Sequence, residues 1–231
     1  MSHGGLTLAK YLRKRDKNIE IIIVEKQEYI SYSQCAMPYY ISGEVSEEDI
    51  VFNSAQDLKE KYDLEIYLKT EVIEIYPEKN QIQVSETNKG TIFNVSYDYL
   101  VLSVGSIAKK LKEFENLGDN IFIHKNLRNA KRLKRFIERN EPRNVLIVGS
   151  GAISLELSEN LNKLGIDVYI LEKEDVLIPR FDKDISMEIE NIVSEFVTVI
   201  KEGKILKVRE NTELYRGRNR DVLEVEYSIR K

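Results

Sequence analysis

The chain has 231 residues, 42% of them hydrophobic and 32% charged, with a formal net charge of −4 at pH 7. That much apolar material supports a folded core and excludes an intrinsically disordered chain. The nearly balanced charge gives no electrostatic basis for nucleic-acid binding. No apolar run approaches the roughly 20 residues that cross a bilayer, and residues 1–10 lack the layout of a signal peptide. We therefore expect a soluble, cytoplasmic α/β protein with no nucleic-acid or membrane partner.

Cysteine and histidine are scarce. The single cysteine, Cys35, excludes an internal disulfide and a multi-cysteine zinc site. Two histidines, His3 and His124, argue against a histidine-rich metal centre, so we expect no metal site. Any redox chemistry that the side chains perform must therefore use one thiol.

The chain opens with a predicted helix and a predicted buried strand. Apolar residues at helical spacing in 6–14, with basic residues at the end, indicate the helix. Residues 21–24 form an unbroken β-branched run, which is typical of a strand buried on both faces of a parallel sheet. The strand ends at an acidic residue, Glu25.

Further strands and a domain boundary are predicted next. Residues 64–84 and 91–95 predict antiparallel strands, and 97–104 predict an apolar strand closed by Gly105. A polar stretch follows at 108–120, and we place the boundary inside it, with domains at 1–112 and 113–231.

The second domain repeats the order of elements. Residues 129–140 predict a basic amphipathic helix, 144–148 a strand, 153–164 a helix and 168–171 another strand. Glu172 again follows the strand, and alternating segments after residue 193 predict further strands.

A glycine turn lies between the first strand and helix of this domain. Gly149 and Gly151 match the first two glycines of a dinucleotide fingerprint, in which Ser154 replaces the third. The first glycine allows the tight turn, the second lets a pyrophosphate approach the backbone, and the helix N-terminus favours anions. A carboxylate at Glu172 can accept hydrogen bonds from a ribose 2′-hydroxyl and repels a 2′-phosphate, which favours NADH over NADPH. The alternative is a strand–helix turn with no ligand.

A shorter version of the same pattern opens the chain. Ser2, His3, Gly4 and Gly5 precede the first helix, and Glu25 follows the next strand. The strand and the glycine that would come before Ser2 are missing. Two glycines near a terminus are also typical of a flexible start. The interpretation as a shortened dinucleotide fingerprint therefore depends on the acid at residue 25.

Cys35 lies three residues before Pro38, which fits the first turn of a helix. A thiol at a helix N-terminus has a lowered pKa and is a nucleophile. The equally weighted alternative is a small buried core residue, the usual place of a free cysteine.

Together these residues resemble the FAD-dependent pyridine nucleotide-disulfide oxidoreductases with a single redox cysteine. Residues 35–41 (Cys-Ala-Met-Pro-Tyr-Tyr-Ile) and 149–156 are similar to coenzyme A-disulfide reductases. His3 and its neighbours instead resemble NADH peroxidases and oxidases. Residues 70–72, 97–106 and 179–182 resemble further segments of the family. The implied fold is two Rossmann-like βαβ units, first FAD-type and then NAD-type, with antiparallel meander insertions.

The resemblance implies a role for each matched residue. Cys35 and His3 are the catalytic residues, and Thr7, Lys14, Ser31 and Gln34 contact the substrate. The implied FAD contacts are Ser2, Gly4, Gly5, Glu25, Lys26, Val72, Ser103, Gly105 and Lys125. The implied NAD(P)H contacts are Gly149, Gly151, Ile153, Ser154, Glu156 and Glu172.

The implied reaction passes hydride from NADH through FAD to Cys35, which reduces coenzyme A disulfide or a related disulfide or persulfide. One alternative is an NADH peroxidase or oxidase that uses a Cys35 sulfenate with His3. Another is an inactive piece that retains only nucleotide binding. The residues around Cys35 argue against a third alternative, an electron-transfer reductase for an iron–sulfur protein.

The chain is also shorter than the family pattern. The resemblance implies a first strand, a returning FAD segment and a C-terminal dimerisation domain, and none of these is present in the 231 residues. We therefore expect the chain to be part of a homodimeric parent enzyme, and by itself to hold FAD poorly or not at all.

Overall fold

The computed structural model describes residues 3–215 and 218–230. The chain divides into two compact units: unit 1 is Met1–Ser33 with Glu47–Ile107, and unit 2 is Gln34–Ser46 with Ala108–Lys231. The segment with Cys35 is therefore grouped with unit 2, although the boundary placed from the sequence puts it in the first domain. The functional labels of the two domains stay predictions. No helix in the described part of the chain is long and apolar enough to cross a membrane.

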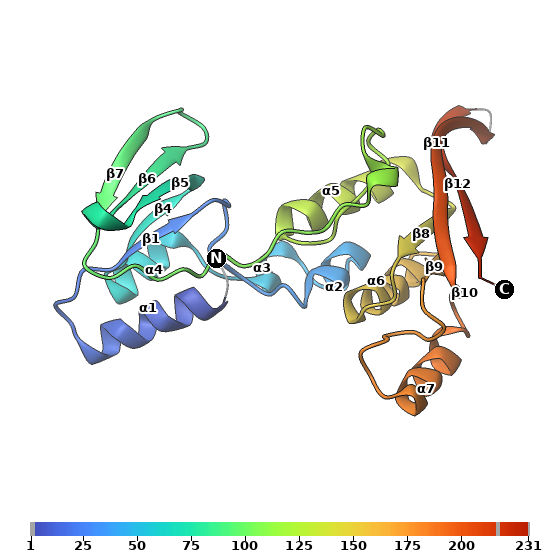
Figure 1. The fold of residues 1–231 in the computed structure, drawn as a ribbon, viewed down its shortest axis with the longest axis horizontal. Helices are drawn as coiled ribbons and strands as arrows, with labels where there is room; N and C mark the ends of the chain where they lie inside the picture. The colour runs from blue at the N-terminus through green and yellow to red at the C-terminus, as the bar shows by residue number, and fades with distance from the viewer. Residues whose placement is uncertain (1–2, 216–217, 231) are drawn as a thin grey trace. The chain divides into compact units, whose positions relative to one another are not determined.

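Unit 1 is built around two parallel strands, β1 (Ile22–Glu25) and β4 (Glu65–Leu68). Helices α1 (His3–Arg15) and α4 (Ala55–Tyr62) cover one face of this pair (Figure 1). Ile23 is buried between the strands and these helices, and the same core contains Leu6, Ala9, Ile21, Ile30, Leu58 and Leu64. The apolar run of β1 thus forms the predicted strand, and Ile23 is buried on the helix side. The predicted burial of both faces is wrong, because Ile22 and Val24 on the other face are only half-buried.

An antiparallel meander lies on the other face of the two strands (Figure 1). Successive side chains of a strand point to opposite faces, so Tyr67 points away from the helices, and its ring lies 5.5 Å from that of Phe93. The meander consists of β5 (Thr70–Tyr76), β6 (Gln81–Glu86) and β7 (Ile92–Ser96). The remaining elements of unit 1 are β2 (Ser31–Tyr32), α3 (Glu47–Ile50), β3 (Val51–Asn53) and the 3-10 helix η1 (Pro77–Lys79).

The antiparallel strands predicted in 64–84 and 91–95 are confirmed for β5, β6 and β7. Two further expectations for unit 1 are wrong. The stretch 64–84 begins with β4, which pairs parallel with β1. Residues 97–104 form no strand, and the apolar side chains nearby are exposed, Tyr99 by 91% and Ile107 by 95%. An extended segment becomes a strand only where another strand supplies hydrogen-bond partners. In the described residues the β1–β4 sheet has no third strand.

Unit 2 contains a three-stranded parallel sheet in the order β10-β9-β8. The chain passes from β8 (Asn144–Val148) through α6 (Ala152–Lys163) to β9 (Asp167–Leu171), and through α7 (Lys183–Val193) to β10 (Thr198–Ile200). This is the βαβ order that the sequence of the second domain predicts.

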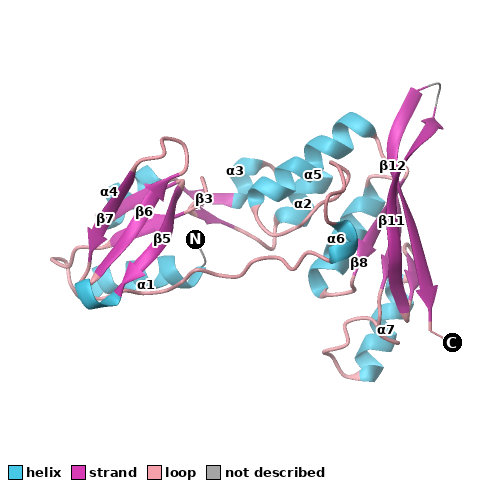
Figure 2. Cartoon of the chain, turned by 45° about the horizontal axis from the view of Figure 1, so that its top comes forward, coloured by secondary structure: helices cyan, strands magenta, loops and turns pink. Residues whose placement is uncertain are grey.

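A long hairpin of β11 (Gly203–Tyr215) and β12 (Arg218–Ile229) completes unit 2 (Figure 2). Ile205 and Val208 of β11 pack with Leu171 of β9, and Leu146 of β8 lies against the same cluster. Ile205 and Val208 share this buried face because a register shift between Ile205 and Lys207 interrupts the alternation along β11. The other elements are α2 (Met37–Ser42), the 3-10 helix η2 (Lys112–Phe114) and the basic helix α5 (Leu127–Asn140).

Candidate functional site

The glycine turn of unit 2 connects β8 to α6. Gly149 has φ +93°, a left-handed conformation that strongly favours glycine, and its N–H donates to the carbonyl of Leu171 at 2.9 Å. Gly151 is the N-cap of α6 and accepts from the N–H groups of Ser154 and Leu155. A Cβ added at Gly149 or Gly151 would meet nothing within 4 Å. The backbone of the turn therefore faces open space.

The first turn of α6 leaves backbone donors free. In the described part of the chain, the N–H groups of Gly151, Ala152 and Ile153 have no hydrogen-bond acceptor. Three such donors at the positive end of a helix form a site that suits a phosphate. Ile153 and Glu156 are exposed and Ser154 is half-buried, so the predicted contacts of this helix lie around its N-terminal turn.

Glu172 follows β9 and contacts the same turn. Its Oε2 accepts hydrogen bonds from the N–H of Ser150 at 2.9 Å and from the Ser150 hydroxyl at 2.7 Å. Its Oε1 accepts from the N–H of Glu174 at 3.0 Å. The residue is only 5% exposed, and burial alone would raise its pKa. The hydrogen bonds from Ser150, Glu174 and Lys173 outweigh burial and hold the pKa below its ordinary value.

This shift predicts a pH dependence of stability. A carboxyl whose pKa is lower in the folded state adds stability above its unfolded pKa and loses it as the pH falls through its folded pKa. From about pH 5 downwards, we expect the free energy of unfolding to fall more steeply for the wild-type chain than for Glu172→Gln. Urea unfolding of both proteins at a series of pH values measures this. Parallel pH profiles would show that Glu172 contributes no such linkage.

In unit 1, α1 presents its N-terminus at the carboxyl edge of the parallel strands. Arg13, near the other end of α1, donates to the carbonyls of Tyr62 and Asp63, just before β4 begins. The first turn of α1 therefore lies toward the edge where β1 and β4 end. His3 begins α1, with Gly4 and Gly5 inside its first turn, whereas the sequence places all three before the helix. Ser2 lies outside the described residues.

Three of the predicted FAD contacts lie at that edge. Glu25 is the last residue of β1, and its Oε1 accepts from the N–H of Gln27 at 2.8 Å. The Lys26 ammonium lies 2.6 Å from Glu71 of β5, one residue before the exposed Val72. The fold thus brings these residues, which lie far apart in the sequence, to one edge of unit 1.

The other predicted flavin contacts lie outside helices and strands. Ser103 and the exposed Gly105, with φ +69°, belong to the irregular segment at the end of unit 1. Lys125 is half-buried and precedes Asn126, the N-cap of α5. Next to it, both ring nitrogens of His124 are buried without a hydrogen-bond partner in the described residues, and burial lowers its pKa.

Cys35 is exposed and lies two residues before α2, so the alternative of a buried core cysteine is wrong. Pro38 lies in the first turn of α2, as predicted. Of the predicted substrate contacts, Thr7, Lys14 and Gln34 are exposed. Ser31 is buried in β2, and its hydroxyl accepts from the amide of Asn53 at 3.4 Å. Its side chain is therefore not presented to solvent. The association of His3 with Cys35 stays a prediction.

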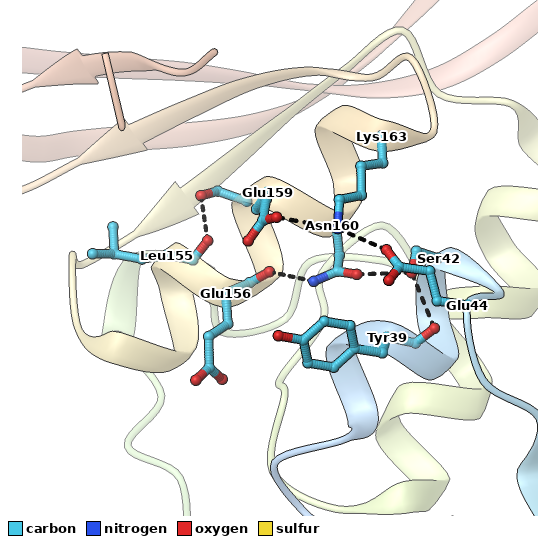
Figure 3. Close-up of polar contacts among 9 residues, drawn as sticks. Tyr39, Ser42, Glu44, Leu155, Glu156, Glu159, Asn160 and Lys163 are labelled. Atoms are coloured by element: carbon cyan, nitrogen blue, oxygen red, sulfur yellow. Dashed lines mark hydrogen bonds and ion pairs between the residues drawn. The ribbon is translucent and has the colours of Figure 1, made fainter. Parts of the chain in front are cut away.

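Side chains that the sequence did not reveal hold the segment after Cys35 on α5 and α6, and Figure 3 shows the contacts with α6. Asn160 of α6 is fully buried, and its Oδ1 accepts from the Ser42 hydroxyl at 2.7 Å, while its Nδ2 donates to the carbonyl of Glu156. The ammonium of Lys163 lies 2.7 Å from Glu44. On the α5 side, Lys134 donates to the carbonyl of Tyr40 at 2.7 Å. The thiol segment and the glycine turn thus share helix α6.

Asn160→Ala should destabilise this attachment. The substitution removes both amide hydrogen bonds from a buried position, which costs about 1–3 kcal/mol in the free energy of unfolding. Urea unfolding of wild type, Asn160→Ala, Ser42→Ala and the double variant measures the loss. We expect a coupling of at least about 0.5 kcal/mol between the two positions, and additive losses would contradict a direct bond between Asn160 and Ser42.

The parallel strands, the glycine turn and the acid after β9 define a dinucleotide-binding α/β protein. The family model for pyridine nucleotide-disulphide oxidoreductases matches residues 2–229, and the chain belongs to this family. It is 38% identical over 189 residues to a coenzyme A disulfide reductase of Staphylococcus aureus, covering 80% of this chain and 42% of that protein. It is 34% identical over 180 residues to an NADH oxidase of Methanocaldococcus jannaschii, covering 77% and 40%.

A solved structure gives the same assignment. The crystal structure of reduced Bacillus anthracis CoADR-RHD matches with a TM-score of 0.84 and 26% identity, covering 98% of this chain and 41% of that one. The mixed α/β fold with parallel and antiparallel sheets is thereby confirmed. The chain spans about two fifths of the length of these relatives.

Proposed function

We propose that the protein is a flavin-dependent oxidoreductase that takes electrons from NADH and reduces coenzyme A disulfide, or a related disulfide or persulfide, at Cys35. The observation that carries this proposal is the turn between β8 and α6, with its free N–H donors and Glu172 beside it. The relatives named coenzyme A disulfide reductase support the choice of acceptor.

NADH would bind at the glycine turn of unit 2. The free N–H groups of Gly151, Ala152 and Ile153 suit the pyrophosphate. The negative charge of Glu172 disfavours a 2′-phosphate, and this supports NADH over NADPH. Lys173 does not offset that charge strongly, because its exposed ammonium pairs with Glu174 at 3.0 Å.

The described residues fit the adenosine end of FAD better than the flavin end. Gly4, Gly5, Glu25, Lys26 and Val72 lie toward one edge of unit 1. When bound, FAD supplies the two-electron transfer between NADH and the thiol. The unpartnered nitrogens of His124, beside Lys125, are consistent with a polar group binding there. The predicted contacts Ser103 and Gly105 lie in a segment without helix or strand.

The role proposed for Cys35 is nucleophilic attack. Its thiolate forms a bond to one sulfur of the substrate disulfide, the substrate S–S bond breaks, and one thiolate leaves. Two electrons that come from NADH then reduce the mixed disulfide and release the second thiol. The exposed position of Cys35 allows a substrate to approach.

We further propose a cytoplasmic location and, for the whole protein, a homodimer.

A second candidate is an NADH peroxidase or oxidase, which the relative named NADH oxidase favours. In this case the Cys35 thiolate attacks a peroxide, forms a sulfenate and releases an alcohol or water. His3→Ala distinguishes the candidates. It should lower peroxide reduction at least about tenfold if the imidazole acts as an acid–base group, and leave disulfide reduction nearly unchanged. Equal effects on both substrates would contradict this division of roles.

The proposal is tested by loading the chain with excess FAD, desalting it, and recording absorbance before and after adding NADH. A retained flavin band that NADH bleaches, followed by release of coenzyme A thiol from its disulfide, supports the proposal. A colourless protein that NADH stabilises against unfolding supports the remaining alternative, a chain that binds only the nucleotide. A protein that binds neither FAD nor NADH contradicts both.

A further inference from the structure

The hydroxyl of Ser150 connects three parts of unit 2. It donates to Glu172 Oε2 at 2.7 Å, while the N–H of Ile178 donates to it at 3.1 Å. The backbone N–H of Ser150 also donates to Glu172 at 2.9 Å. Ser150 is 1% exposed, so no water competes for these bonds. The middle residue of the glycine turn therefore fixes both the acid after β9 and the loop beyond it.

The loop that Ser150 holds is strained. Ile178 has φ +45°, a left-handed conformation that is rare for a β-branched residue, and Pro179 follows it. Its carbonyl accepts from the N–H of Phe181 at 2.9 Å and from the hydroxyl of Ser186 at 3.4 Å. Strained backbone persists only where the surroundings hold it. Ser150 and Ser186 are the two buried hydroxyls that do so here.

Glu172 has little freedom to turn. A carboxylate accepts about four hydrogen bonds in total, and three with good geometry are present here: Ser150 donates twice to Oε2 and the N–H of Glu174 donates to Oε1, which leaves one acceptor position for a ligand. The hydroxyl of Ser150 is the one side-chain donor among them. Removing it takes away one of the bonds that fix the rotamer of the acid, without altering the glycines or the backbone donors of α6.

We propose that Ser150 is a positioning residue that sets the coenzyme selectivity of this site by holding Glu172 and the 173–182 loop in place. This inference rests on the proposed NADH site. The ribose of NADH offers a 2′-hydroxyl to Glu172, and that of NADPH does not. A misplaced Glu172 therefore weakens NADH binding and reduces the repulsion of NADPH. A purely structural role of Ser150 would weaken both nucleotides alike.

The experiment compares dissociation constants of NADH and NADPH, measured by nicotinamide fluorescence on the full 231-residue chain. For Ser150→Ala we expect NADH to bind about tenfold more weakly. The selectivity ratio, which is the dissociation constant of NADPH divided by that of NADH, should fall by at least the same factor. The matched control is Ser158→Ala, another fully buried serine of unit 2, whose hydroxyl donates within α6 to Leu155. It should leave the ratio unchanged.

Two further arms make the test decisive. The double variant with Glu172→Gln and Ser150→Ala should have the same selectivity ratio as Glu172→Gln alone, because both substitutions act through the same carboxylate. In the nucleotide-free chain, Ser150→Ala should raise the NMR-measured pKa of Glu172 toward its ordinary value. A wild-type chain that binds neither nucleotide overturns the proposed function. A wild-type chain that prefers NADH, with the same ratio in Ser150→Ala, overturns this inference alone.

Discussion

Replacing Gly151 by alanine should lower the affinity for NADH at least about tenfold and change the free energy of unfolding by less than about 1 kcal/mol. Gly151 has an ordinary φ of −67°, and a Cβ there would meet no atom of the protein. The folded chain therefore has no reason of its own to require glycine at this position. Binding of a pyrophosphate does require glycine here. A methyl group at residue 151 would occupy the path along which the pyrophosphate approaches the free N–H groups of α6.

Gly165→Ala is the matched control, at the opposite end of α6. Gly165 has φ +76° and open space around it, so alanine there costs about 1–2 kcal/mol in backbone strain. We expect this variant to lose stability and keep its affinity for NADH, the reverse of Gly151→Ala. Fluorescence titration and urea unfolding of both variants measure the two effects. An unchanged NADH affinity in Gly151→Ala would place the nucleotide elsewhere.

The parts of the fold that could be predicted are those that short-range patterns determine. The β-branched residues of β1 and β8 predict strands of a parallel sheet. A glycine turn after a strand predicts the start of α6. Glu25 and Glu172 are found with the same pattern, because Glu25 ends β1 and Glu172 follows β9. The approach of Glu172 to the turn before α6 is a consequence of the β8–α6–β9 connection.

The parts that could not be predicted depend on a partner far away in the sequence. The apolar residues around Tyr99 satisfy the pattern of a strand, yet a strand also needs a neighbour with free hydrogen-bond groups. Asn160 and Ser42 are ordinary polar residues in the sequence, and only the packing of α2 on α6 makes their bond. The same holds for Ser150, whose hydroxyl acts through Glu172 and Ile178.

Cys35→Ser should remove NADH-dependent reduction of coenzyme A disulfide, with a loss of at least about a thousandfold, because serine cannot form the mixed disulfide. The side chain is exposed and the substitution changes one atom, so the fold and the glycine turn stay intact. The rate of coenzyme A thiol release by the flavin-loaded chain measures the effect. The NADH dissociation constant of the same variant is the internal control, and we expect it to be unchanged.

The result has only one interpretation because the chain contains no second cysteine that could replace Cys35. Turnover that persists in Cys35→Ser would therefore mean that electrons reach the substrate without a protein thiol. The proposed disulfide mechanism would then be wrong, while the nucleotide site would remain. Loss of disulfide reduction together with retained NADH binding would separate the two halves of the reaction. It would assign the contact with substrate to the segment before α2 and show that this segment is not required for NADH binding.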